Sequence, residues 1–421
     1  MYNGLSLDQA PPISVVMRFF LMVPLFGIAL SLLVFLNPEA VLTPNHPISL
    51  TAIHLMFLGI ISMSMLGALF QMQSVLGGRP IQEPLGNAFI IHIFFVIGIL
   101  SLAEAFITPL PELFVIASVF LGASVLYTAN LILPLLFGSI TNDTLRGMRI
   151  ALVSLSVTAI LGVIMASEYA NESFSTFHEV IRISHYSLGL IGWVAILIIA
   201  VAFQVVEMFY VTTPYSLWCK RNAFRVIVGS LFFKIIWLFL SLPFVWIFDL
   251  MIGALLFGFI ATTLKRLHQR KRRVRDVSIW FWNAGIALLS IATISYAIFI
   301  GSANESLQTM ALISFAFFAL AIILAMMGKI VPFLVWFHLN SAGYMDVPIM
   351  SNIIPLHRVK WLFWLFALTL VMALGGIFFI PLFAVSAILG GLMFSLLLFN
   401  LVQALRMYRY VRIHGKRLIQ G

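Results

Sequence analysis

The feature that most constrains this chain is a series of apolar runs, each about twenty residues long, that recurs from one end to the other. A helix of that length crosses the roughly 30 Å hydrocarbon core of a bilayer. The runs are continuous and do not alternate between apolar and polar residues, which excludes the strand pattern of a membrane barrel. Charged residues make up 9% of the 421 positions, whereas a soluble domain carries about a quarter. The sequence therefore predicts an all-α polytopic protein embedded in a lipid bilayer.

Twelve of these runs are predicted as transmembrane helices. The stretch from Arg225 to Leu264 is too long for a single span, and Pro243 marks the hairpin between two helices. The single cysteine, Cys219, excludes an internal disulfide and a cysteine-based zinc or iron–sulfur site. The predicted spans are 14–36, 48–77, 86–106, 112–137, 145–167, 178–211, 223–241, 244–265, 278–300, 307–339, 359–379 and 381–405.

The distribution of charge in the loops predicts the topology. Lys and Arg gather in alternate loops, most densely in the loop that holds Lys265, Arg266, Arg270, Lys271, Arg272, Arg273 and Arg275. Such loops remain in the cytoplasm, and the intervening loops carry Glu with almost no Lys or Arg. The net charge of +10 is explained in this way and needs no nucleic-acid partner. We expect both termini inside, in a bacterial cytoplasmic (inner) membrane, with 406–421 as a basic cytoplasmic tail.

Short sequence matches recur at a nearly constant spacing. Ala170-Asn171-Glu172-Ser173 returns at 303–306, which is an offset of 303 − 170 = 133 residues, and Phe70-Gln71 returns at 203–204 with the same offset. Coincidence in an apolar sequence of low diversity is the alternative explanation. The spacing corresponds to four helices, so the matches predict three pseudo-repeats within one membrane domain, 1–421. Their approximate bounds are 1–137, 138–267 and 268–405.

Ionisable residues within a bilayer are costly and indicate functional positions. Glu207, Lys329 and His338 lie near cytoplasmic helix ends, where a partner or a snorkelling side chain accounts for them. His54 and His185 differ, because each is predicted roughly 10 Å below the outer surface at 1.5 Å per residue. The full set within the predicted helices is His54, His92, Glu104, His185, Glu207, Lys234, Asp249, Lys329 and His338.

His54 and His185 lie in the second helices of successive repeats, and a Leu-Gly step follows each of them. Two imidazoles at similar depth suit axial ligation of a haem, and imidazole also suits copper. His178, seven residues before His185 on the same helical face, is a further candidate metal ligand. Two imidazoles that bind one iron have their ligating nitrogens about 4 Å apart. The alternative is that each is a core histidine bonded to a backbone carbonyl or a serine hydroxyl.

Three stretches resemble a known family: 54–59 (HLMFLG), 185–193 (HYSLGLIGW) and 329–338 (KIVPFLVWFH). With twelve helices in three four-helix units, the chain is similar to haem-copper oxidase subunit I and to the related NnrS-type membrane proteins, which are associated with nitric oxide stress. The resemblance implies that His54 is the ligand of a low-spin haem b and that His185 is on the helix of the first copper ligand.

The chain departs from the oxidase pattern at the oxygen-reducing centre. The His-Pro-Glu-Val-Tyr motif and the adjacent histidine pair after the seventh helix are absent, and Leu312, Ile313 and Ser314 stand where histidines of the tenth helix are expected. The resemblance therefore implies a non-oxidase relative that binds haem or copper, in nitric oxide or redox stress or in metal handling. It also implies a respiratory-chain or redox protein as a partner.

Two other classes of protein fit part of the same pattern. A secondary transporter also has twelve helices with both termini inside, but such transporters divide as six plus six, with their long loop between helices 6 and 7. A cofactor-free assembly partner of a respiratory complex is the third class. No residue pattern assigns a substrate or an enzymatic reaction.

Overall fold

The computed structural model describes residues 7–139, 142–271 and 276–417. Within these ranges the chain is helical and no strand is present, and twelve helical segments are long and apolar enough to cross a membrane. The protein is therefore an all-α integral membrane protein, as predicted. The long helices are α1 (Ile13–Leu36), α4 (Met63–Gly77), α5 (Pro84–Ile107), α6 (Pro111–Gly138), α7 (Asp143–Ala170), α8 (His178–Ser187), α9 (Ile196–Phe209), α10 (Leu217–Phe239), α11 (Trp246–His268), α12 (Val277–Ser302), α13 (Glu305–Ser341), α15 (Leu356–Gly376) and α16 (Ile380–His414). The short ones are α2 (Pro38–Leu42), α3 (Pro47–His54), α14 (Met350–Ile353) and the 3₁₀ turn η1 (Leu7–Gln9).

The predicted spans agree with these helices to within a few residues, and the hairpin at Pro243 is confirmed between α10 and α11. The largest differences are at α10, which begins at Leu217 and not at 223, and at α16, which runs to His414 and not to 405. Ser216 caps α10 by accepting a hydrogen bond from the Cys219 N–H at 3.2 Å. Hydropathy identifies the part of a helix that matches the apolar layer of the bilayer. A helix with a capped end can continue beyond that layer, so hydropathy alone does not predict where it begins or ends.

The contacts between helices divide the chain into two compact units, each of which is described by itself. Unit 1 comprises Met1–Pro11, Leu69–Val274 and Ile286–Phe315. Unit 2 comprises Pro12–Ala68, Arg275–Gly285 and Ala316–Gly421. This division does not follow the three predicted sequence repeats, and the superposition of those repeats stays a prediction.

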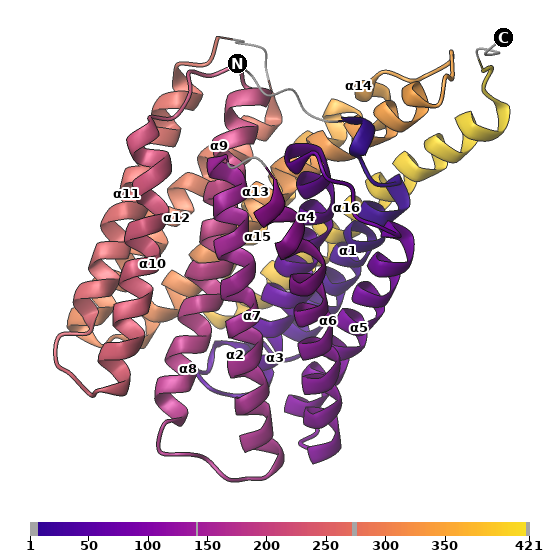
Figure 1. Ribbon diagram of the computed structural model, residues 1–421. Helices are drawn as coiled ribbons and strands as arrows, with labels where there is room; N and C mark the ends of the chain where they lie inside the picture. The colour runs from indigo at the N-terminus through magenta and orange to yellow at the C-terminus, as the bar shows by residue number, and fades with distance from the viewer. Residues whose placement is uncertain (1–6, 140–141, 272–275, 418–421) are drawn as a thin grey trace. The chain divides into compact units, whose positions relative to one another are not determined.

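Unit 1 is built around α7. Helices α5, α6 and α7 pack in sequence order, as Figure 1 shows, and α7 also packs against α8 and α9. Helices α5 and α6 approach closely at Gly98, where an added Cβ would lie 2.8 Å from the backbone nitrogen of Leu121. The Ser124 hydroxyl donates to the Ile91 carbonyl across the same interface at 2.9 Å. Small residues thus allow close helix contact, which is how helices associate in a bilayer.

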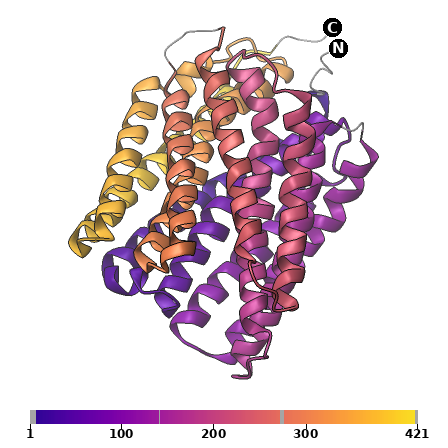
Figure 2. The ribbon, with the colours of Figure 1, turned by 90° about the vertical axis from the view of Figure 1, so that its left-hand side faces the viewer.

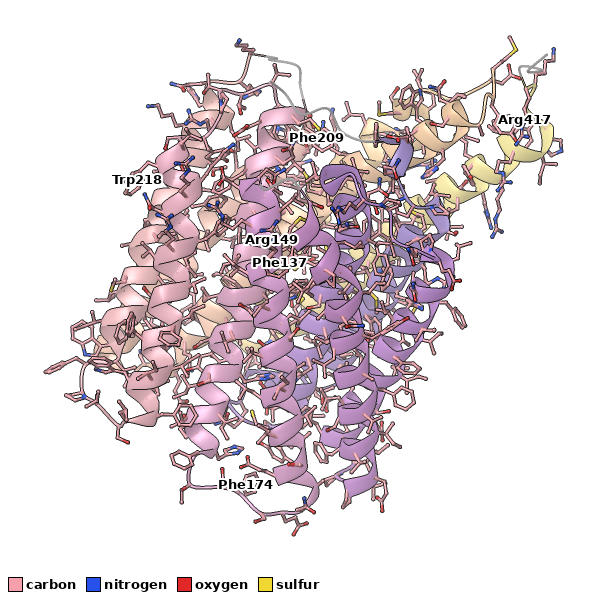
Figure 3. All side chains as sticks on the ribbon, in the orientation of Figure 1. Phe137, Arg149, Phe174, Phe209, Trp218 and Arg417 are labelled. Carbon is pink, nitrogen blue, oxygen red and sulfur yellow. The ribbon has the colours of Figure 1, made fainter. Side chains whose placement is uncertain are left out.

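The two ends of unit 1 differ in charge. The end at which α7 finishes and α8 begins carries Glu168, Glu172 and Glu179 and is called here the acidic end. Phe177 and Phe239 contact each other at this end with ring centroids 5.7 Å apart, so the tip of the α10–α11 hairpin also lies there. Figure 3 shows Phe174 at this end and Arg149 beside Phe137 towards the opposite one. The Arg149 guanidinium lies 5.0 Å from the Phe137 ring centre.

Unit 2 is built around α1 and α16. Helix α16 packs against α1 and α15, and α15 and α16 run side by side as the amber and yellow helices of Figure 2. Gly27 of α1 lies against the ring of Phe394 of α16, where any side chain would collide with the ring. The first turns of α12 pack on α15 through Phe281 and Phe366, with ring centroids 5.5 Å apart.

Two π-helices interrupt the second and sixth membrane spans. They are η2 (Leu55–Ser62) and η3 (Leu188–Ala195), and their first residues are 188 − 55 = 133 positions apart. This spacing equals the offset of the repeated sequence motifs, so the same rare backbone feature recurs in the register of the predicted repeat. π-helical segments are uncommon and are frequently found at functional sites. The residues immediately before the two π-helices are therefore candidates for a functional site.

Candidate functional sites in the membrane helices

His54 in unit 2 is the last residue of α3, and the π-helix η2 begins at the next position. Its Nδ1–H donates to the carbonyl oxygen of Leu50, one turn earlier, at 2.8 Å. A carbonyl only accepts, so this bond places the proton of the neutral imidazole on Nδ1 and leaves Nε2 as the basic nitrogen. Gly59 lies within η2, and an added Cβ there would lie 2.7 Å from Phe26 of α1. The π-helix is therefore pressed closely against α1.

His185 in unit 1 lies on α8, three residues before η3. Its Nδ1–H donates across the helix interface to the Thr158 carbonyl of α7 at 2.9 Å. This bond again assigns Nε2 as the basic nitrogen. Gly162, one turn further along α7, makes room for the ring, because a Cβ at that position would lie 3.1 Å from His185 Cε1. The orientation of the imidazole is thus set from α7 by one hydrogen bond and one glycine.

The two histidines are not at equivalent positions in the repeat. In the register of the π-helices, His54 corresponds to Ser187, since 187 − 54 = 133, and His185 is two residues off that register. Two residues correspond to about 200° around an α-helix, so the two side chains project from different faces of their helices. His54 belongs to unit 2 and His185 to unit 1. The separation of about 4 Å between their ligating nitrogens stays a prediction.

His178 opens α8 at the acidic end of unit 1. Its Nδ1–H donates to the Glu168 carboxylate at 2.5 Å, and the same carboxylate accepts the Ser175 N–H at 3.1 Å. These bonds close the loop between α7 and α8. The α7 partners of His178 and His185 are ten residues apart (168 − 158), or roughly 15 Å along the helix. The structure therefore does not bring these two rings to one point, although both donate to residues of α7.

Two ionisable residues that the sequence sets aside have close partners. Glu207 binds Lys220 at 2.8 Å and also accepts the Tyr215 N–H at 2.8 Å. In unit 2, Lys329 forms an ion pair with Asp276. Pairing accounts for both residues, but only Glu207 lies near a helix end, because Lys329 is twelve residues before the end of α13 at Ser341.

A buried polar cluster in unit 1 was not selected as a site from the sequence. The Lys234 ammonium of α10 lies 2.6 Å from the Asp249 carboxylate of α11 and donates to the Ser187 hydroxyl at 3.1 Å. Lys234 is 3% exposed, and the Asp249 side chain is 14% exposed. Ser187 immediately precedes η3 and occupies the repeat position of His54. A charged pair thus contacts the residue immediately before the second π-helix.

Tyrosines extend this cluster. Tyr186 on α8 and Tyr296 on α12 interact electrostatically with each other and with Asp249. Tyr186 also interacts with Arg182, which forms a two-point salt bridge with Glu179 at 2.6 and 2.8 Å.

One signal in the sequence could have identified the Lys234–Asp249 pair. Lys234 is nine residues before Pro243 and Asp249 is six residues after it, so a hairpin places the two opposite charges at similar depth. A chain with so few charged residues retains such a pair only at considerable cost. The involvement of Ser187 and the tyrosines could not be predicted, because it depends on how α8 and α12 pack.

Comparison with known proteins does not assign this chain to a family. No family model matches it, and no curated protein matches it. In the part of the chain that the structure describes, no three His, Cys, Asp or Glu side chains are grouped so that they could hold a metal ion.

Proposed function

We propose that the protein binds haem within the membrane and that His54 and His185 are its protein ligands. The observation that carries this proposal is shared by both residues: each donates Nδ1–H to a backbone carbonyl, and each stands just before a π-helix. Metal-binding histidines typically donate their second ring nitrogen in this way, which fixes the tautomer and raises the basicity of the ligating nitrogen. A core histidine could form the same carbonyl bond, so the test must address Nε2.

The donor set fits haem better than copper. A haem supplies four ring nitrogens of its own and needs only one or two axial side chains, whereas a copper site of the common three-ligand type needs a group of side chains. Such a group is absent from the described ranges. When bound, haem would supply one-electron redox chemistry or binding of a small gas. The chain's own residues would hold it, and the Thr158 carbonyl and Gly162 would orient His185.

Absorption spectroscopy tests the proposal. Protein purified after expression with haem supplementation should contain iron, show a Soret band, and develop a split α-band on reduction. His54→Ala and His185→Ala should each abolish the low-spin spectrum. Gly162→Ala should shift it without abolishing it, because the added methyl group displaces the His185 ring by a few tenths of an ångström. Elemental analysis of the same samples distinguishes iron from copper.

His414→Ala is the matched control. His414 donates Nδ1–H to the carbonyl four residues earlier, as His54 does, but its side chain is exposed at the end of α16. Its replacement should leave the spectrum unchanged. A colourless protein without iron or copper would contradict the proposal and leave the transporter and assembly-partner classes.

The proposed setting is a bacterial inner membrane with both termini in the cytoplasm, supported by the concentration of Lys and Arg in alternate loops. The acidic end of unit 1 would then face outward. The nitric oxide, redox-stress or metal-handling role, and a respiratory-chain partner, rest on the resemblance of the sequence motifs.

A further inference from the structure

The Lys234–Asp249 pair is buried where ions are expensive. Lys234 lies five residues before the end of α10 and Asp249 three residues after the start of α11, so both are about one turn or more inside the span. A buried pair of this kind contributes little net stability, because apolar residues of similar volume often stabilise a protein equally well. Within a membrane, such residues typically belong to ion or proton pathways.

A row of polar side chains on α8 begins at the acidic end of unit 1 and ends at Tyr186 of the cluster. Glu179, Arg182 and Tyr186 follow one another on α8 at spacings of three and four residues, which places them on one helical face. Arg182 and Glu179 are partly exposed, with side-chain exposures of 36% and 60%. Tyr186 is the third residue of this face, and it interacts electrostatically with both Arg182 and Asp249.

We propose that Asp249 is a reversible proton-binding site, held by Lys234 and Ser187 and reached from the acidic end of unit 1 along the face of α8 that carries Arg182 and Tyr186. A proton that reaches Asp249 converts its carboxylate to the neutral acid and leaves Lys234 as a single positive charge bound to Ser187. The charge of the cluster then rises by one beside Ser187, the residue immediately before η3. The site does not involve haem and is independent of the function proposed above.

The groups that face Asp249 come from three elements. Lys234 on α10 is the only charged group in contact with it among the described residues, while Tyr186 on α8 and Tyr296 on α12 are the titratable groups that interact with it electrostatically. Of these, the lysine favours the charged carboxylate, and burial favours the neutral acid. Because these two effects oppose each other, Asp249 can bind a proton while the protein stays folded.

Infrared difference spectroscopy of the full-length protein in lipid nanodiscs tests the proposal, with the pH changed in steps over the range in which the protein stays folded. Lowering the pH should reveal the C=O stretch of a protonated carboxylic acid, and the band should disappear when the pH is restored. Asp249→Asn should remove this band. Lys234→Met should shift its midpoint to higher pH by more than one unit, since loss of the ammonium removes the charge that favours the carboxylate.

Tyr186→Phe should slow the appearance of the band after a pH jump without moving its midpoint. Asp143→Asn is the matched control, because Asp143 belongs to an accessible helix-end pair with Arg146 in the same unit, and the band should persist. The double variant Lys234→Met with Asp249→Leu should fold with wild-type stability and lack the band. Absence of a reversible band in the folded wild-type protein, or its persistence in Asp249→Asn, would overturn the proposal and make the pair a structural link between α10 and α11.

Discussion

Gly192→Ala should destabilise unit 1, and the structure gives the size of the effect. Gly192 lies in η3 against α7, and a Cβ built there would lie 2.8 Å from the Cβ of Ser154 and 2.7 Å from its hydroxyl oxygen. The hydroxyl can rotate away, but the Ser154 Cβ is fixed to the backbone. Carbon atoms pack at about 3.5–4.0 Å, so α7 and η3 must separate by about 0.7–1.2 Å. Overpacking of this kind costs about 1–3 kcal/mol.

The matched control is Gly229→Ala on α10, where an added Cβ meets nothing within 4 Å. Alanine is a better helix former than glycine by about 1 kcal/mol, so this control should be neutral or slightly stabilising. The free energy of unfolding is measured for purified protein in mixed micelles titrated with SDS. Ser154→Gly should restore much of the stability lost in Gly192→Ala, because it removes both colliding atoms.

The same substitution should affect His185, whose hydrogen bond to Thr158 spans the interface between α7 and α8. Separation of the helices would lengthen this 2.9 Å bond, and the spectrum of any bound haem should change in parallel with stability. The close contact between η3 and α7 would be refuted if Gly192→Ala and Gly229→Ala unfolded with the same free energy.

Three further outcomes are expected. Burial raises the pKa of Asp276, but hydrogen bonds from Lys329 and a neighbouring serine outweigh it and hold the folded-state pKa below the ordinary value. The pair should therefore stabilise the fold above about pH 4, the unfolded pKa, and lose this contribution as the pH falls further, so Asp276→Asn should flatten an acid unfolding profile. In a Cys219→Ser background, a cysteine at Arg270 should be labelled only from the cytoplasm and one at Glu172 only from outside, and the reverse labelling would overturn the topology. In an experimental structure, a three-way superposition should fit better than a six-plus-six division, with the segments 1–137, 138–267 and 268–405.

The sequence by itself determined the class of fold and the position of each membrane span. Helix length and hydropathy are set by the thickness of the bilayer and by the need to satisfy backbone hydrogen bonds within each segment, so they can be predicted without knowing how the helices pack. The hairpin at Pro243 followed from the same reasoning, because a stretch of forty mostly apolar residues is too long for one span. Only the helix ends were displaced, at Leu217 and His414, where caps and polar turns outside the membrane decide the boundary.

Only the tertiary structure decided what each polar residue in the membrane does. His54, His185, Lys234 and Asp249 were equally visible in the sequence as costly residues. His54 bonds within its own helix, but the partners of the other three come from packing between helices. The Thr158 carbonyl is bonded by His185 because Gly162 lets α8 approach α7. The π-helices were also invisible, since a π turn and an α turn have the same hydrophobic composition and differ only in which carbonyl each N–H reaches. Contacts with neighbouring helices decide which carbonyl is bonded, and the hydrophobic periodicity of a single segment carries no information about those contacts.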